Sequence, residues 1–531
     1  MMRWVSYLLA ASMLASVAAC SGNNVTNFPD ASHTNISEDE STASDGVPRI
    51  SYMDGMWDAQ IPAPEGAAVQ AIDSKFGIDF KPQFYYMQEY PDKLAVTMAS
   101  GELPDMIGLE NPDSRFVKWA RQGAFLKLND LIAHYPTLSK IPQSAWSSVS
   151  VDGSIYAIPR WFTKKYGKRP VIRKDWLDNL GLKMPANYKE LLDVLIAFTK
   201  DDPDRNGKAD TIGLGMSSAG TGLLYGAAMG VGYDSSAWYY RNSAGQLIPG
   251  TIAASNKEQV QFLAQLYKAG GIAKDWAVSK MSDVRDAFFT GQIGMYFEQP
   301  YDFNEKRFAG LRTLQPSAEL AVIPPFMQDD GQSGYLSSGK GIYQMITLNA
   351  ALSQNQKKAD LILGMLDYMS TWIPWENRGP SNADFDWQYG GVGKGYEMKD
   401  GIAVEKADAQ NSRPKNYLIG RYWAPNDEVL QPQNAVTDPL AKQFVANAVG
   451  TLEHVKMYKN PVDEIESPLR NEKESELEEA FTDHVTRMII GEESITNWDA
   501  AVDEYLQDGG QAIIDEVNAL LKKNGIEPGW E

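Results

Sequence analysis

The chain has 531 residues and a formal net charge of −20 at pH 7. Such an acidic chain lacks the basic surface that a nucleic-acid backbone requires, so we expect no nucleic-acid partner. Charge alone cannot hold it to an anionic membrane surface either. Its length allows about two or three folded domains, and its 14 tryptophans and 25 tyrosines indicate a large core with aromatic side chains to spare.

The first 19 residues have the pattern of a secretory signal peptide. Arg3 precedes an apolar stretch over residues 5–19, and small residues lead into Cys20, the only cysteine of the chain. A cysteine at this point resembles the bacterial lipobox, in which the thiol is acylated, for example with palmitate. A single thiol in an exported protein cannot form an internal disulfide. We therefore predict a signal peptide over 1–19 and lipidation at Cys20; the alternative is an ordinary signal peptide with a chance cysteine.

Residues 20–46 are rich in Ser, Asn, Thr, Asp and Glu and carry few large apolar side chains. Such a segment cannot bury enough surface to offset its chain entropy. We predict a lipidated flexible tether over 20–46 and a folded part that begins near Val47. No other stretch of the sequence is long and apolar enough to cross a membrane, so the lipid would be the only membrane anchor.

The first part of the folded chain alternates between strand and helix patterns. The sequence predicts a strand at 50–53, a loop carrying Asp54 to Trp57, a helix at 65–76 and a strand at 80–86. Pro91 opens the next helix and Gly101 ends it, and a third strand starts at 104–107. This order predicts a parallel sheet with helical crossovers, that is, an α/β fold.

Later segments repeat this pattern and then become helical. Strands are predicted at 170–172, 320–324 and 342–348, and helices at 175–180 and 188–199. Near the end of the chain, one apolar helix face ends at Gly491 and comprises Leu477, Phe481, Val485, Met488 and Ile489. Two more helices follow, around 495–505 and 514–521. The sequence therefore predicts a helical C-terminal region.

Residues 202–210 carry the oxygen donors of a calcium loop. Asp202, Asp204, Asn206 and Asp210 stand at positions one, three, five and nine, and Lys208 offers its carbonyl at position seven. Gly207 allows the sharp turn, and the three carboxylates repel one another unless a cation lies between them. Position twelve lacks the usual glutamate. We predict a structural Ca²⁺ site; the alternative is an Asp/Asn-rich turn without metal.

Residues 160–174 hold seven cations in a chain that is otherwise acidic. For most of the lysines the better interpretation is a solvated loop. Arg160 and Trp161 are the exceptions, because an arginine beside a tryptophan suits a cleft wall that binds hydroxyl or carboxylate groups. Whether these two bind a ligand or only line a loop stays open at this point.

Several tryptophans lie among Gly, Pro, Asn and Asp, which predicts loops: Trp57, Trp161, Trp238, Trp372, Trp375, Trp387 and Trp423. Loops that follow the strands of open sheets collect binding groups, and the C–H face of a pyranose packs well on an aromatic ring. Trp119 and Trp498 lie at helical spacing among apolar residues and are expected in the core.

We find no signature that demands catalysis. The glycine-rich stretch 334–341 almost matches a phosphate-binding loop, but Gly341 stands where Ser or Thr is required. There is no nucleophile elbow, and the histidines His33, His134, His454 and His484 have no metal-ligand spacing. We therefore predict no catalytic residue and a protein that binds its ligand without turnover.

Seven segments carry a family resemblance: ASGELPDM at 99–106, GAFLKLNDL at 123–131, DGSIYAIPR at 152–160, IRKDWLD at 172–178, FTGQIGM at 289–295, IIG at 489–491 and WD at 498–499. Together they resemble the extracellular solute-binding proteins, family 1, of ABC importers. The likeness runs from about residue 48 to the end. It is strongest to the long lipoprotein branch found in carbohydrate-degrading Firmicutes.

The resemblance implies a two-lobe, periplasmic-binding-protein-like α/β fold with hinge-crossing strands. The N-terminal lobe would comprise 47–158 plus about 322–368, and the C-terminal lobe 159–321 plus about 369–531. The first crossing would lie at 158–161 and the second near 323–325. The loop at 202–210 also resembles one in family members that bind acidic oligosaccharides, where a carboxylate follows position nine; here Thr211 stands instead.

The resemblance further implies the substrate-binding component of an ABC importer, lipid-anchored on the extracellular face of the cell membrane. It would act as a monomer, capture an oligosaccharide and deliver it to the permease subunits. The cations at 160–174 favour an acidic sugar such as a uronide, with a neutral oligosaccharide as the alternative. The expected binding residues are Trp57, Arg160, Trp161, Trp238, Tyr239, Glu298 and Trp375. The alternatives are a lipid-anchored glycan-degrading enzyme and a ligand-binding sensory partner of a histidine kinase.

Overall fold

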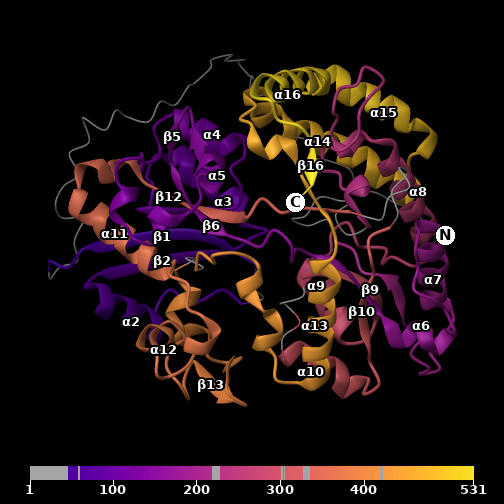
Figure 1. Cartoon of the computed structure of the whole chain (residues 1–531), viewed down its shortest axis with the longest axis horizontal. Helices are drawn as coiled ribbons and strands as arrows, with labels where there is room; N and C mark the ends of the chain where they lie inside the picture. Colours follow the sequence, from indigo (N-terminus) through magenta and orange to yellow (C-terminus); the bar gives the residue numbers. More distant parts are fainter. Residues whose placement is uncertain are drawn as a thin grey trace, which may run out of the picture.

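The computed structural model describes residues 46–57, 60–217, 228–299, 303, 305–326, 335–418 and 422–530. The predicted signal peptide, Cys20 and nearly all of the predicted tether lie outside the described residues. Within these ranges no helix combines the length and the apolar character that a bilayer crossing needs. The described chain forms two lobes around two separate sheets (Figure 1).

The first sheet has the strand order β2-β1-β3-β12-β6. β1 runs parallel to β2 and β3, and β12 is antiparallel to both β3 and β6. Their bounds are Arg49–Met56 (β1), Asp79–Tyr86 (β2), Met106–Leu109 (β3), Ala157–Trp161 (β6) and Ile342–Leu348 (β12). The prediction of a loop from Asp54 is wrong, because β1 stays paired with β2 as far as Met56.

Helices cover this sheet and share its core: α2 (Ala67–Phe76), α3 (Tyr90–Ser100), α4 (Ser114–Arg121), α5 (Gln143–Ser148) and α11 (Gln356–Met369). The predicted helices at 65–76 and from Pro91 onward are confirmed. Both end at a left-handed glycine, Gly77 and Gly101, a conformation that costs glycine little. A short hairpin of β4 (Ser150–Val151) and β5 (Ser154–Ile155) completes the main body of this lobe.

The second sheet has the order β10-β7-β9-β8. β7 is antiparallel to β9 and β10, while β8 is parallel to β9. The strands are β7 (Arg169–Arg173), β8 (Ile212–Leu214), β9 (Ile293–Glu298) and β10 (Leu320–Val322). The helices around them are α6 (Lys174–Leu180), α7 (Tyr188–Lys200), α8 (Ala254–Ala269), α9 (Met281–Phe289) and α10 (Glu305–Leu314). The helices predicted at 175–180 and 188–199 are α6 and α7.

The C-terminal region is helical, as predicted, and it completes the second lobe. It comprises α13 (Pro439–Glu453), α14 (Pro468–Ile490), α15 (Trp498–Tyr505) and α16 (Gln511–Asn524). The predicted face of α14 is buried in the core of the second lobe, and Gly491 ends the helix in the left-handed conformation. A small sheet of β11 (Leu336–Ser337), β15 (Met457–Lys459) and β16 (Gly529–Trp530) lies beside these helices.

The lobe boundaries remain a prediction, and one segment packs differently from the predicted division. Residues 369–418, assigned above to the second lobe, include α12 (Ala383–Gln388), β13 (Tyr396–Lys399) and β14 (Ile402–Glu405). Tyr417 and Leu418 belong to the core of the first lobe, and the Tyr417 hydroxyl donates to the carbonyl of Ala63 at 2.8 Å. The chain therefore returns to the first lobe before it enters α13.

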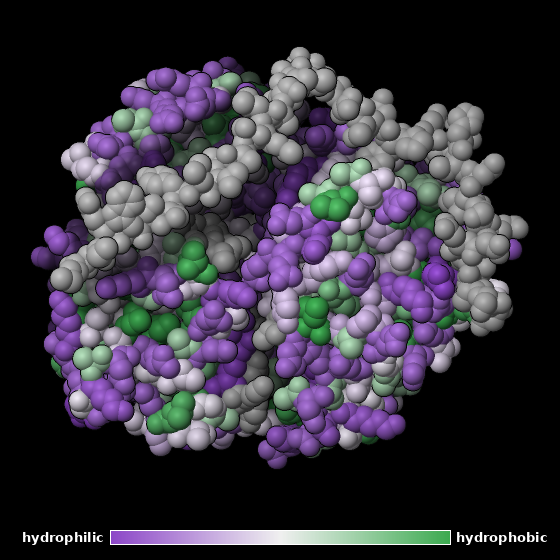
Figure 2. All heavy atoms as spheres, turned by 180° about the vertical axis from the view of Figure 1, so that it is seen from behind, coloured by the Kyte–Doolittle hydropathy of each residue, from purple (hydrophilic) through white to green (hydrophobic). Residues whose placement is uncertain are grey.

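The two sheets are joined by segments that cross between the lobes. β6 stays in the first sheet as far as Trp161 and β7 starts the second at Arg169, so the first crossing follows the predicted segment 158–161 directly. The second follows β11, which pairs with β15 in the second lobe, and enters the first sheet at Ile342, so it lies after the predicted segment 323–325. Figure 2 shows the face opposite to Figure 1, with polar side chains over both halves, scattered apolar patches and a furrow between the halves.

Candidate functional site

Four strands of the first sheet end at one edge. β1, β3 and β6 point the same way and β12 runs against them, so three carboxyl ends and one amino end meet there. Trp57 follows β1, Glu110 follows β3, Tyr343 lies at the start of β12 and Arg160 near the end of β6. Ligands of open α/β sheets bind at this kind of edge. We call these four residues and Gln344 the first-lobe edge.

Side chains at the first-lobe edge are linked by hydrogen bonds. The indole N–H of Trp57 donates to the Tyr343 hydroxyl at 2.6 Å, and that hydroxyl donates to Glu110 Oε1 at 2.8 Å. Burial raises the pKa of Glu110, although the bond from Tyr343 opposes this shift. Burial also raises the pKa of Tyr343, so its hydroxyl stays a donor at neutral pH. The half-buried indole of Trp57 is thus held in one orientation.

Gln344 introduces backbone strain at this edge. Its φ is 63°, in the left-handed region that a residue other than glycine rarely adopts, and the pairing of β12 with β6 shifts register between Ile342 and Met345. The irregularity aims the Gln344 amide at Arg160, whose Nη1 donates to Gln344 Oε1. Such strain is typically found at functional sites. Arg160 is only 8% exposed, so the guanidinium is held rather than free in solvent.

Asp54 lies beside this network and was not predicted as a site residue. It is buried on β1, where Oδ2 accepts from the Tyr52 hydroxyl and Oδ1 from the Gly55 N–H at 2.7 Å. Burial raises the pKa of Asp54 from 3.8 to about 7; these two bonds and the charge of Arg160 oppose the shift. Asp54 is thus a carboxyl that titrates near neutral pH.

The second lobe presents a different edge. Glu298 ends β9 and is fully buried, opposite Arg169 in the register with β7. Burial alone would raise the pKa of Glu298, but Arg285, with its Nε 2.5 Å from Oε2, lowers it below the ordinary value. Arg169 donates to the carbonyls of Lys165 and Lys168 at 2.8 and 2.9 Å. Glu298 is therefore ionised and already paired.

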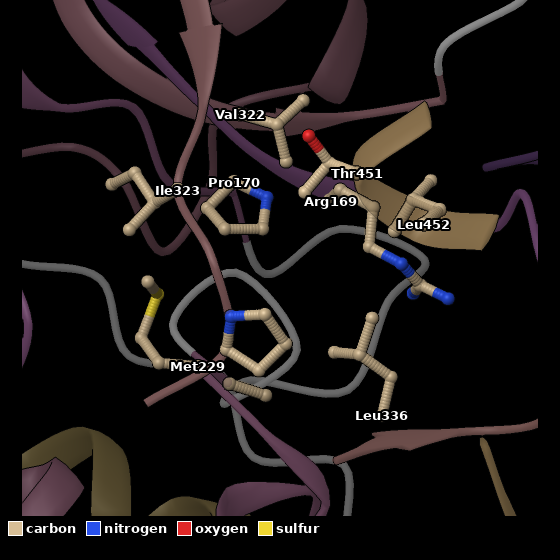
Figure 3. A pocket seen from close by; sticks show the side chains of 10 residues that line it. Arg169, Pro170, Met229, Val322, Ile323, Leu336, Thr451 and Leu452 are labelled. Atoms are coloured by element: carbon tan, nitrogen blue, oxygen red, sulfur yellow. The ribbon is translucent and has the colours of Figure 1, made fainter. Parts of the chain in front are cut away.

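A small, mostly apolar pocket adjoins this second edge. In Figure 3 the guanidinium of Arg169 and the hydroxyl of Thr451 stand out among apolar side chains. The lining comes from β7, β10, β11 and α13, together with Met229. The cavity gives this edge an apolar wall with a cation at its side.

Trp161 and Trp375, predicted as binding residues, lie in one aromatic cluster where the lobes meet. The Trp161 ring at the end of β6 lies 6.3 Å from that of Tyr422, which lies 4.5 Å from Trp372. Trp375 begins the 3-10 turn Trp375–Asn377, and its indole N–H donates to the carbonyl of Leu430 at 2.9 Å. Trp161 belongs to the first sheet, whereas Leu430 belongs to a core cluster of the second lobe.

Trp238 and Tyr239 are not brought to either edge by their packing. Trp238 is 1% exposed in the core of the second lobe, and its carbonyl accepts from the Tyr458 hydroxyl at 2.7 Å. Tyr239 is half-buried and packs edge-on against Tyr458, with ring centroids 5.3 Å apart. The Trp238 indole is buried and offers no surface to a ligand.

The loop at 202–210 closes on itself around Asn206. Asp202 accepts from the backbone N–H groups of Asn206 and Gly207, both at 3.0 Å, and Gly207 has φ 80°. The Asn206 amide donates to Asp204 Oδ2 at 2.8 Å and to Asp210 Oδ1 at 3.2 Å. Burial and the neighbouring Asp202 and Asp210 raise the pKa of Asp204. Carboxylates that repel in this way favour a cation between them.

Gln315, just beyond α10, supplies a further group to the loop. Its Nε2 lies 3.3 Å from Asp204 Oδ2, while its buried Oε1 accepts no hydrogen bond from the described residues. In the described ranges no three acidic, His or Cys side chains are grouped as a ready metal site. The oxygen donors of the loop nonetheless fit a calcium ion in kind, with the orphaned Gln315 oxygen close by.

Comparison with known proteins places this geometry in a family. Residues 67–362, more than half of the chain, match the family described as bacterial extracellular solute-binding protein. Lipoprotein LipO of Bacillus subtilis (strain 168) is 26% identical over 98% of both chains. The polygalacturonan/rhamnogalacturonan-binding protein YtcQ of the same strain is 25% identical over 90% of this chain and 92% of its own.

A similar fold has been solved for the alginate-binding protein AlgQ2 without calcium ion. It is 20% identical, with a TM-score of 0.65, and the match covers 89% of this chain and 98% of that one. The predicted fold class, two lobes joined by crossing segments, is confirmed, and the family is one of binding proteins rather than enzymes. The chain belongs to the bacterial extracellular solute-binding proteins.

Proposed function

We propose that this protein is the substrate-binding component of an ABC importer and that it captures an oligosaccharide between its lobes. The observation that carries the proposal is the first-lobe edge. It presents a fixed indole, Trp57, together with hydrogen-bonding groups of Glu110, Tyr343 and Arg160, at the ends of four strands. An aromatic face beside fixed polar groups suits a sugar ring, which has apolar C–H faces and a rim of hydroxyls.

The relatives support the same ligand class. YtcQ is named for binding polygalacturonan and rhamnogalacturonan, and AlgQ2 for binding alginate. From these names we infer a polysaccharide fragment as ligand for this chain as well. The proposed binding set comprises Trp57, Arg160, Trp161 and Trp375, joined by Glu110 and Tyr343, which the sequence did not single out. Glu298 is left out of this set, because it is fully buried and paired with Arg285.

Closure of the two lobes would trap the ligand. Three segments cross between the lobes, after β6, after β11 and between Leu418 and α13, and they allow the lobes to move against each other. Ligand groups that contact both edges stabilise the closed form, which the permease subunits would recognise. Arg121 of α4 lies 4.0 Å from Glu466 just before α14, so a charge pair reaches from one lobe to the other.

Isothermal titration calorimetry against a panel of plant and bacterial oligosaccharides tests this function. We expect at least one glycan to bind and Trp57→Ala to weaken it by more than tenfold, since stacking and the orientation set by Tyr343 are both lost. The matched control is Trp387→Ala, a half-buried tryptophan packed on the other side of the first lobe with Phe76 and Tyr368. Binding of peptides but of no glycan would rule the proposal out.

We propose a structural calcium ion at the loop 202–210, with Asp202, Asp204, Asn206, Lys208 and Asp210 as ligands. The ion would neutralise the carboxylates and so stabilise the turn between α7 and β8; its role would be structural. Adding EDTA to the protein should lower the melting temperature, and calcium should restore it. Asp210→Asn should reduce this response. A melting temperature that is the same with chelator and with calcium would contradict the site.

We also propose that Cys20 carries the lipid that keeps the protein on the extracellular face of the membrane. The sequence pattern and the similarity to a lipoprotein over nearly the whole chain support this. Fractionation of cells that express the intact precursor tests it: wild type should be found with the membrane and Cys20→Ala in the medium. Equal membrane association of both would exclude the anchor. Size-exclusion chromatography with light scattering checks the expected monomer.

A further inference from the structure

Arg378 lies in a cage of aromatic rings that holds its guanidinium in place. The guanidinium carbon lies 3.8 Å from the ring centroid of Trp375, 4.8 Å from that of Trp372 and 5.7 Å from that of Tyr422. Its Nε donates to the carbonyl of Ile373 at 3.0 Å. Stacking on tryptophan and one backbone bond fix the plane of the guanidinium and leave its two Nη groups as an oriented pair of donors.

No carboxylate of the described residues pairs with this guanidinium. The chain has 69 acidic residues against 49 lysines and arginines. Most arginines in the described ranges lie within 4.0 Å of a carboxylate. Arg49 pairs with Asp79, Arg115 with Asp113, Arg173 with Asp175 and Arg285 with Glu298. Arg378 is half-buried, so its charge is partly removed from water, and no described carboxylate lies within 4.0 Å to balance it.

The cage lies where the proposed binding residues of the two lobes meet. Tyr422 joins it to Trp161 at the end of β6, next to Arg160, and Trp375 is tied to Leu430 of the second lobe. Asp427 reinforces this joint, because it accepts from the hydroxyl of Thr163 and from the backbone N–H of Lys165. A pre-oriented guanidinium at this place is well suited to accept an anion from the ligand.

We propose that Arg378 binds a carboxylate of the ligand and that this ligand is an oligosaccharide of acidic sugar units. This inference rests on the proposed function and adds the charge of the ligand to it. The two Nη donors match the two oxygens of a carboxylate in a bidentate pair. The rings of Trp372 and Trp375 lie beside that carboxylate and pack against sugar. Withdrawal from bulk water strengthens the pair and the preference for a charged over a neutral unit.

Calorimetry with three matched ligands tests the inference: trigalacturonate, its methyl ester, and a neutral trisaccharide such as maltotriose. We expect wild type to bind the acid at least tenfold more tightly than the ester, with an affinity that falls as salt rises. Arg378→Gln should lose tenfold or more toward the acid and leave the ester unchanged. Arg378→Lys, which keeps the charge without the planar fork, should retain part of the preference.

Arg49→Gln is the matched control, because Arg49 begins β1 and lies at the opposite end of that strand from Trp57. It should leave all three affinities unchanged, and circular dichroism melting should show every variant folded. Equal binding of acid and ester by wild type, or an equal loss of affinity for both in Arg378→Gln, would contradict recognition of the ligand's carboxylate by Arg378. Tight binding of only the neutral trisaccharide would also overturn it, while the proposed function would stand. Binding of no glycan would remove both.

Discussion

The two lobes each bury a carboxylate on a central strand, and the two groups behave in opposite ways. Asp54 is 3% exposed on β1 of the first sheet, and Glu298 is fully buried at the end of β9 in the second. Burial raises the pKa of Asp54 to about 7. The same burial acts on Glu298, but Arg285 outweighs it and lowers the pKa of that carboxylate.

The difference shows that the presence of an ionic partner, and not the depth of burial, decides whether each carboxyl group is charged at neutral pH. Glu298 is in contact with a guanidinium, so it stays ionised at neutral pH. Asp54 receives hydrogen bonds from neutral donors, while the nearby Arg160 is engaged by Gln344. The first lobe therefore has a carboxyl group that exchanges its proton near neutral pH beside the first-lobe edge, and the second lobe has a fixed ion pair.

The charge of Glu298 depends on Arg285, and removal of Arg285 should have the largest effect on stability. Arg285→Met should destabilise the protein by about 3–5 kcal/mol, because a buried carboxylate is left without its cation. Urea unfolding at pH 7 measures this loss. In the double variant Arg285→Met with Glu298→Gln neither charge of this pair remains, so part of the stability should return. A loss below about 1 kcal/mol in Arg285→Met would mean that the pair behaves like an exposed salt bridge.

The pH dependence of the unfolding free energy tests the raised pKa of Asp54. Because the folded pKa of Asp54 is raised, its protonation stabilises the folded state fully below pH 3.8, and this contribution is lost as pH rises to about 7. Asp54→Asn, which cannot ionise, should therefore gain stability relative to wild type between pH 4 and 7, and the gain should level off above. At about 1.4 kcal/mol per pKa unit, the difference is at most about 4 kcal/mol.

Unfolding free energies of both proteins at intervals from pH 4 to 8 give this difference directly. Glu298→Gln is a useful control, because its parent carboxylate has a lowered pKa. Over this pH range it should therefore differ from wild type by a nearly constant amount, because the pH window in which it loses stability relative to wild type lies below the ordinary Glu pKa of 4.5. A flat difference for Asp54→Asn would show that Asp54 is already ionised in the folded protein.

The fold was predictable from local patterns because those patterns are set by neighbours in the sequence. The apolar face of α14 and its end at Gly491 follow from helical spacing and the left-handed glycine. The position of Asp54 within β1 was not predicted by such local patterns. Asp followed by Gly is typical of a turn, yet the chain stays in β1 because the Asp54 carboxyl is satisfied by Tyr52 and Gly55.

The site was less predictable because long-range contacts decide what a side chain does. Trp238 does lie in a loop, as predicted, but Tyr458 and Asn460, more than 200 positions away, bury it. Arg378 gave no signal in the sequence. Its cage exists only because residues 372–378 meet Tyr422 and Leu430. Trp57 was predicted from its position after a strand, and the structure adds its partners Tyr343 and Glu110.

Gly108 tests how closely the first lobe packs around Asp54. A Cβ at Gly108 would lie 2.1 Å from the Asp54 carboxyl, so Gly108→Ala must displace that group. We expect a loss of about 1–3 kcal/mol in unfolding free energy, as for other overpacked cores. Gly364→Ala is the control. Gly364 lies within α11 with open space around its Cβ position, so the substitution should be neutral or stabilising. Equal effects of both would contradict close packing at Asp54.

The smallest expected effect concerns the hydroxyl that links Trp57 to Glu110. Tyr343→Phe keeps the ring but removes one acceptor and one donor, so we expect a loss of about 1 kcal/mol in unfolding free energy. The pKa of Glu110 should rise further, since the bond from Tyr343 lowers it. Tyr389→Phe is the control, because the Tyr389 hydroxyl makes no hydrogen bond with the described residues, and it should change neither quantity. If Tyr343→Phe leaves oligosaccharide affinity intact, ligand binding does not depend on the orientation that this hydroxyl gives to Trp57.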